Sequence, residues 1–179
     1  MSLLHRAGYV AMLWVASLIP GPVDAQALCC SSISGEVNVE RAEELEAQAH
    51  EVLRDIRQTG KAAKLLRKAA ALRPVGDPIA VKDLTAAGQL SYYAGDLRLA
   101  ETTFKKAADA ALRIGDVLTT AHALIDVAHV AIELRDASSA LTSVERAQLL
   151  ASSPHLSQSD RMRLMGRLNA MTGMASALD

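Results

Sequence analysis

The chain has few of the residues that carry stacking, disulfide or strongly electrostatic functions. Among its 179 residues are three tyrosines, one tryptophan, one phenylalanine and two cysteines, and the formal net charge at pH 7 is −1. Nucleic-acid binding by base stacking needs several aromatic platforms, and binding to a phosphate backbone needs a basic surface. The composition therefore argues against a nucleic-acid partner, and no polybasic segment points to a membrane surface.

Motifs of catalysis and cofactor binding are also missing from the sequence. There is no glycine-rich phosphate loop and no G-x-S-x-G nucleophile turn. The acidic residues between positions 40 and 51 alternate with basic ones, as on a solvated helix face. His122 and His129 lie about 10 Å apart along a helix, whereas a helical zinc pair needs a spacing of three or four residues. We therefore expect no enzyme activity, no cofactor and no metal site.

What the chain does contain is apolar sequence, since half of its residues are hydrophobic. The first apolar block has the form of a secretory signal peptide, with Arg6 before an uncharged run at residues 7–19. The Ala-Gln-Ala sequence at residues 25–27 fits a small-x-small cleavage site. We predict a signal peptide over residues 1–27, a mature start at Leu28, and export as a periplasmic or secreted protein. The alternative is an uncleaved segment that anchors the protein to a membrane.

The two cysteines, Cys29 and Cys30, are adjacent and follow the predicted cleavage site. Adjacent cysteines pair with each other only through a strained ring, so a disulfide between them is not expected. Lipid attachment at Cys29 and an intermolecular disulfide stay open. The residues 26–28 depart from the lipoprotein pattern, in which Leu and two small residues precede the modified cysteine. We expect residues 28–37 to be a disordered linker.

One segment then occurs twice, 40 residues apart, at residues 81–107 and 121–147. The corresponding positions of the first copy are Leu84, Ala87, Gly88, Tyr92, Gly95, Asp96, Ala100, Phe104 and Ala107. Those of the second copy are Leu124, Val127, Ala128, Ile132, Arg135, Asp136, Ala140, Val144 and Ala147. A repeat of this length holds a helix, a turn and a second helix, and such hairpins stack on one another. Small residues let the helices approach, and large ones fill the space between them.

The first copy resembles the signature of the tetratricopeptide repeat, which has Ala-Gly, Tyr, Gly-Asp at the turn, and then Ala, an aromatic residue and Ala. The second copy has Arg135 at the turn glycine and Val144 at the aromatic position, and a third, partial match ends at Pro74. The resemblance covers about residues 40–178. It implies a right-handed superhelical solenoid whose concave groove binds a peptide or protein segment, and it implies no activity. A plain antiparallel bundle is the alternative fold.

Apolar spacing and turn residues predict an all-α domain over residues 38–179, with seven helices in antiparallel hairpins and no strand. The expected helices are residues 39–58, 61–72, 79–94, 97–114, 117–134, 137–150 and 158–178. Thr59-Gly60 is expected to end the first helix, and Asp136 to cap the sixth. Ser157 or Ser159 is expected to cap the last helix.

The same patterns predict which faces are buried and which are wet. Leu168, with Met162, Met165 and Met171, is expected to face the core from the last helix. The basic residues of the second helix are expected on its outer, solvated side. They are Lys61, Lys64, Arg67, Lys68 and Arg73.

In the tetratricopeptide family the first helix of each hairpin lines the groove, so the resemblance also implies candidate site residues. They are Lys82, Thr85, Gln89, Tyr92, His122, Ile125, His129, Ile132, Arg163 and Arg167. Spacings of three and four keep each set on one helix face. A mixture of aromatic, imidazole and guanidinium groups suits an extended peptide or a carboxylate-bearing tail. The alternative is that the tyrosine and the histidines only pack between hairpins.

These observations predict an exported protein-interaction or scaffold module with a peptide or protein as its partner. The alternative is a structural repeat protein that self-associates through exposed hairpin faces or through Cys29 and Cys30.

Overall fold

The computed structural model describes the backbone of residues 25–178 and the side chains of residues 35–178. This part of the chain is all-α, as predicted. Its helices are α1 (Ala25–Val52), α2 (Thr59–Leu72), α3 (Pro78–Tyr93), α4 (Leu97–Arg113), α5 (Val117–Glu133), α6 (Ala137–Ala151) and α7 (Gln158–Ser176), with a short 3-10 helix, η1, at Ile56–Gln58. None of the described helices is both long enough and apolar enough to span a bilayer. Apart from residues 25–27, the predicted signal peptide lies outside the described residues.

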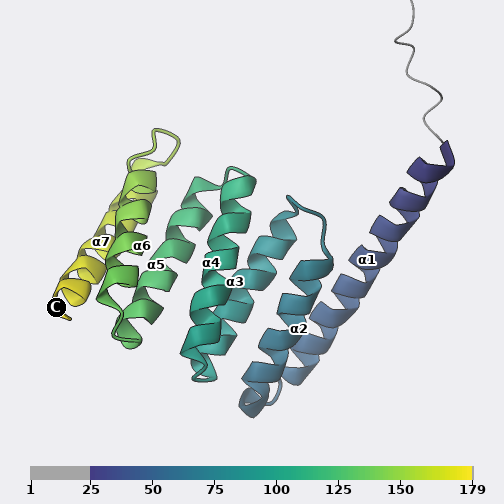
Figure 1. Cartoon of the computed structure of the whole chain (residues 1–179), viewed down its shortest axis with the longest axis horizontal. Coiled ribbons are helices and arrows are strands. Elements are labelled where there is room, and N and C mark those ends of the chain that lie inside the picture. Colours follow the sequence, from purple (N-terminus) through teal and green to yellow (C-terminus); the bar gives the residue numbers. More distant parts are fainter. Residues whose placement is uncertain (1–24, 179) are drawn as a thin grey trace, which may run out of the picture.

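The helices stand side by side in a row that runs from α1 at one end to α7 at the other (Figure 1). Each helix packs antiparallel against the next one along the chain, and α5 also packs against α7. Two further contacts skip one helix: Tyr92 of α3 meets His129 of α5, and Ser139 of α6 meets Glu101 of α4. The odd-numbered and the even-numbered helices therefore form the two layers of the row.

Three of the turns between helices share one backbone design. Gly95, Gly115 and Arg135 have positive φ angles of 80°, 74° and 60°, and they lie 20 residues apart. Each is followed by an aspartate whose carboxylate accepts from a backbone N–H of the next helix, namely Asp96 from Leu99, Asp116 from Thr119 and Asp136 from Ser139. A left-handed residue ends one helix and the aspartate caps the next. The predicted turn at Gly95-Asp96 and the predicted cap Asp136 are confirmed.

The core lies between the two layers, and small residues set the distance between helices. A Cβ atom added at Gly88 of α3 would lie 2.6 Å from Cε1 of Phe104 on α4, whose side chain is only 3 % exposed. The other small residues predicted at helix contacts are all buried, namely Ala100, Ala107, Ala128, Ala140 and Ala147. Leu124 and Val144 are buried among them. Close approach at small side chains and filling by large ones is the packing that the repeat predicts.

The first helix differs from the prediction at both of its ends. α1 begins at Ala25, so it runs through residues 28–37, for which the sequence predicts disorder. It ends at Val52, and Ile56, which its spacing places on the inner face, is 81 % exposed. Asp55 interrupts the helix, because its side chain accepts from the N–H of Arg57 and so competes with the helical backbone. Residues 59 and 60 therefore begin α2 instead of ending the helix before it.

The last helix begins as predicted but turns a different stripe inward. Ser157 caps α7 by accepting from the N–H of Asp160. Met162 and Met165 are 68 % and 41 % exposed, so the prediction that they face the core is wrong. The buried residues are Leu164, Leu168 and Ala175, with Met171 partly buried beside them. This stripe faces inward because α7 packs against both α5 and α6, and only these spacings face both neighbours.

Candidate functional site

The ten predicted groove residues lie on α3, α5 and α7, and we call the surface shared by these helices the odd-helix face. Lys82, Gln89, His129, Arg163 and Arg167 are exposed there, and Thr85, Tyr92, His122 and Ile132 are half-buried. Ile125 differs from the others, since it is 1 % exposed and belongs to the main core cluster with Leu164 and Leu168 of α7. Its side chain is packed beneath α7 and is not available to a ligand.

Two cavities open between α3 and α5 on the odd-helix face. The first, of about 350 Å³, is lined by Lys82, Thr85 and Gln89 together with Asp116 and Thr119. The second, of about 250 Å³, is lined by Gln89, Tyr92, Tyr93, Phe104, Asp126 and His129. Gln89 lines both cavities, so they follow one another along α3. The candidate residues on α3 and His129 on α5 are thus brought together, as the resemblance implies.

The second cavity contains an aromatic contact between α3 and α5. The Tyr92 hydroxyl lies 3.5 Å from Nε2 of His129, and the two ring centres are 5.5 Å apart. Tyr92 packs on the buried cluster that includes Phe104 and Val130, while the side chain of His129 is 47 % exposed. The packing alternative therefore describes the body of Tyr92, whereas its hydroxyl and the imidazole of His129 reach the cavity. A tyrosine commonly combines an apolar body with a polar tip in this way.

A second polar group joins α5 to α7 on the same face. Arg167 donates from Nη2 to Asp126 at 2.7 Å and from Nη1 to Nδ1 of His122 at 2.8 Å. Burial, and next the charge of Arg167, lower the pKa of His122. The imidazole is therefore neutral at pH 7, which leaves Nδ1 free to accept. Because Arg167 already has a carboxylate and an imidazole, Arg163 is the candidate arginine that stays available for an outside carboxylate.

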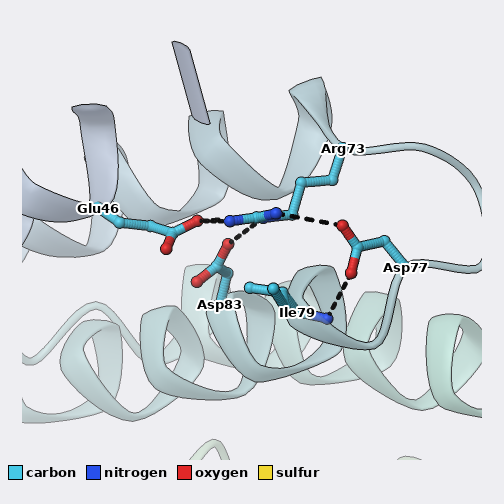
Figure 2. A network of polar contacts seen from close by, with 5 residues as sticks. All are labelled: Glu46, Arg73, Asp77, Ile79 and Asp83. Carbon is cyan, nitrogen blue, oxygen red and sulfur yellow. Dashed lines mark hydrogen bonds and ion pairs between the residues drawn. The ribbon is translucent and has the colours of Figure 1, made fainter. Parts of the chain in front are cut away.

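The structure also contains a buried ion cluster that the sequence does not predict. Arg73, expected on the outer side of α2, has a side chain that is 2 % exposed. Figure 2 shows its guanidinium among three carboxylates, with Glu46 of α1 bonded to it, Asp77 at 3.1 Å and Asp83 of α3 at 3.5 Å. Asp77 also accepts from the N–H of Ile79 at 2.8 Å and so caps α3. The cluster ties α1, α2 and α3 together.

Within this cluster three acids share one cation, and Asp83 carries the excess charge. Burial, and next repulsion from Glu46, raise the pKa of Asp83 to about 6, although Arg73 opposes the shift. Burial also opposes the charge of Arg73, but its hydrogen bonds to Glu46 and Asp77 raise its pKa overall. None of the described cavities is lined by Asp83 or Arg73. A perturbed carboxyl without access to a substrate is structural, even though such shifts often mark active sites.

One signal in the sequence could have found the cluster. At the 40-residue offset Asp83 corresponds to Ala123, which is buried in the second copy of the repeat. An acid at a position where its repeat partner is a buried alanine needs a buried cation, and Arg73 is the cation that α2 supplies.

Within the described residues no group of three or more His, Cys, Asp or Glu side chains lies close enough to hold a metal ion. No family model, no curated protein and no solved structure matches the chain. The site is therefore interpreted from its own geometry and from the repeat signature alone.

Proposed function

We propose that the protein is an exported, tetratricopeptide-like interaction module that binds an extended peptide or protein segment along the odd-helix face. The observation that carries the proposal is the pair of cavities joined at Gln89, lined by polar and aromatic side chains from two successive hairpins. The repeat signature supports it, although the 40-residue spacing is longer than the usual tetratricopeptide period of about 34 residues.

The lining of the two cavities suggests what such a segment contains. From Lys82 to Tyr92 the face is about 15 Å long, which matches four or five residues of extended chain. Lys82 at one end suits an acidic side chain, and the Gln89 amide in the middle can both donate to and accept from a peptide backbone. Tyr92 and Tyr93 at the other end suit an apolar or aromatic side chain.

The proposal can be tested by selecting peptides from a random displayed library on the immobilised chain and measuring their affinity by fluorescence anisotropy. The variant Gln89→Ala/His129→Ala should bind selected peptides at least about tenfold more weakly, because it removes two contacts from the cavities. The matched control is Lys61→Gln/Lys105→Gln, which changes two exposed residues of α2 and α4 and should bind normally. Equal affinity of all three proteins, or selection of no peptide, contradicts the proposal.

Self-association is a second candidate function, and the end of the helix row favours it. α7 exposes Met162, Met165 and Met174 to solvent, and adaptable methionines are common at binding surfaces. Sedimentation velocity with and without reductant should show a reductant-insensitive oligomer that Met162→Lys/Met174→Lys converts to a monomer. A reductant-sensitive oligomer instead indicates pairing through the cysteines, and a monomer removes this candidate.

Export is tested separately by mass spectrometry of the N-terminus of protein recovered from the producing cell. A chain that begins at Leu28 supports cleavage, and an intact Met1 supports the anchored alternative.

A further inference from the structure

A third cavity, of about 500 Å³, lies on the even-numbered helices and has a different lining. One wall is α2, with Lys64, Arg67 and Lys68, and the other is α4, with Lys106, Asp109 and Arg113. Ala70 and Ala71 of α2 and Leu84 of α3 complete the lining. The volume is in the range of cavities that take small organic molecules.

The charge of this cavity is strongly one-sided in a chain whose net charge is only −1. Five cationic side chains line it with a single carboxylate, Asp109. None of the five forms a salt bridge with a carboxylate in the described part of the chain. Neighbouring cations outside the cavity differ, since Lys105 bonds to Glu101 at 2.7 Å and Arg73 has three acids around it. Cations that converge without counter-charges create a local positive potential.

One donor in the cavity is buried without an acceptor. Nε of Arg67 is shielded from solvent and makes no hydrogen bond. An unsatisfied buried donor costs about 1–3 kcal/mol, and more when the group is charged. Native proteins contain few such groups, and each of them asks for a reason. An anion seated between α2 and α4 would supply the acceptor that Arg67 lacks.

We propose that this cavity, which we call the basic cavity, binds a small phosphate-bearing molecule. Donors reach it from two opposite walls, and a tetrahedral phosphate presents oxygens to both walls, whereas a carboxylate accepts in one plane. Two linked phosphates would balance the excess of four positive charges that line the cavity. The alanines and Leu84 offer an apolar surface to an organic part of the ligand. The basic cavity lies on the opposite layer from the odd-helix face, so the two sites can be occupied independently.

The test is calorimetric titration of the full chain with pyrophosphate at low ionic strength, with citrate as a comparison ligand of similar charge. We expect saturable binding of pyrophosphate at one site, weakened by added salt and tighter than that of citrate. Arg67→Gln should weaken pyrophosphate binding by about tenfold to a hundredfold, because it removes a charge-assisted hydrogen bond.

A matched pair of double variants separates a built site from diffuse surface charge. Lys64→Gln/Lys106→Gln removes two exposed cations of the basic cavity, and Lys61→Gln/Lys105→Gln removes the same charge from the same two helices outside it. Only the first should weaken pyrophosphate binding by about tenfold or more. Equal weakening by both, tighter binding of citrate than of pyrophosphate, or no saturable binding would each overturn the proposal. These lysines are exposed, so both variants are expected to fold, which circular dichroism checks.

Discussion

The two copies of the repeat fold alike but solve the same packing problems with different residues. Residues 81–107 and 121–147 both form a hairpin whose turn is left-handed and whose second helix is capped by an aspartate. Thr103 and its partner Ser143 are both buried and both donate to the carbonyl four residues earlier. The backbone requirements are therefore shared, and the differences between the copies lie in side-chain volume and in charge.

The volume difference is a compensated exchange. In the first copy Gly88 faces Phe104, and at the corresponding positions of the second copy Ala128 and Val144 are both buried. The first pair combines the smallest side chain with a large ring, and the second combines two side chains of intermediate size. Cores tolerate such exchanges when the total volume is kept.

The charge difference is not compensated within the repeat. Asp83 belongs to the buried cluster around Arg73, while Ala123 at the same position is simply apolar. The first hairpin is thus held to α1 and α2 by ions, and the second to its neighbours by apolar contacts.

The largest effect is expected from breaking the ion cluster. Arg73→Met leaves Glu46, Asp77 and Asp83 without their cation and should lower the free energy of unfolding by about 3–5 kcal/mol. Arg113→Met is the control, because Arg113 ends α4 as an exposed residue, and it should change stability by less than about 0.5 kcal/mol. Urea unfolding followed by circular dichroism measures both. Similar losses in both variants would mean that the cluster adds nothing.

A smaller effect is expected from converting the first packing pair to the second. Gly88→Ala should destabilise the protein by about 1–3 kcal/mol, because the new methyl group meets the buried ring of Phe104. Adding Phe104→Val gives the Ala-Val pair of the second copy, and the double variant should lose less than the sum of the single losses. A double-mutant cycle from urea unfolding measures the coupling. Additive losses would show that the two positions do not compensate each other.

The pH dependence of stability should separate the two copies by about 1 kcal/mol. Because the pKa of Asp83 is raised from 3.8 to about 6 in the folded state, the folded protein binds the extra proton. Its stabilising contribution is complete below pH 3.8 and is lost as the pH rises through 6. The difference in unfolding free energy between the wild type and Asp83→Asn should therefore fall between pH 5 and 7.5.

The neutral Asp83→Asn variant cancels other titrating groups from that comparison. His122 has the opposite sign, since its lowered pKa makes stability fall as the pH drops below 6.5. A difference that is flat with pH would mean that Asp83 titrates normally.

The smallest effects are expected at the turns, and they should have opposite signs. Arg135 is the non-glycine residue with positive φ in the described chain, so Arg135→Gly should stabilise the protein by about 0.5–1 kcal/mol. Gly95→Ala places a side chain in the same conformation and should destabilise by about 1 kcal/mol. Thermal unfolding detects both changes. Equal signs would contradict a shared left-handed turn.

The sequence predicts the central helices well because their signals are local. A left-handed residue followed by a capping aspartate marks each boundary between α3 and α6 within a few residues of chain. The end of α1 was missed because the side chain of Asp55 competes with the helix. Arg73 was placed outside because its partner Glu46 is 27 residues away.

The candidate sites show the same limit. Spacing along one helix places Lys82, Gln89 and Tyr92 on one face, and these residues do line cavities. Spacing cannot tell that Ile125 is covered by α7. Nor does it bring Lys64 and Lys106 together, because the walls of the basic cavity are separated by all of α3 in the chain. A run of basic residues on one helix reads as a wet surface until the facing helix is known.

The shared turn has a consequence for how this chain can change in length. Asp96 precedes α4 and Asp136 precedes α6 in the same capping geometry, so removal of residues 97–136 would leave Asp96 in position to start the helix that begins at Ala137. Loss or gain of 40 residues at these joints keeps every remaining helix flanked by its own stop and start signals. Insertions of other sizes would not, which makes a pair of helices the natural unit in which such an array grows or shrinks.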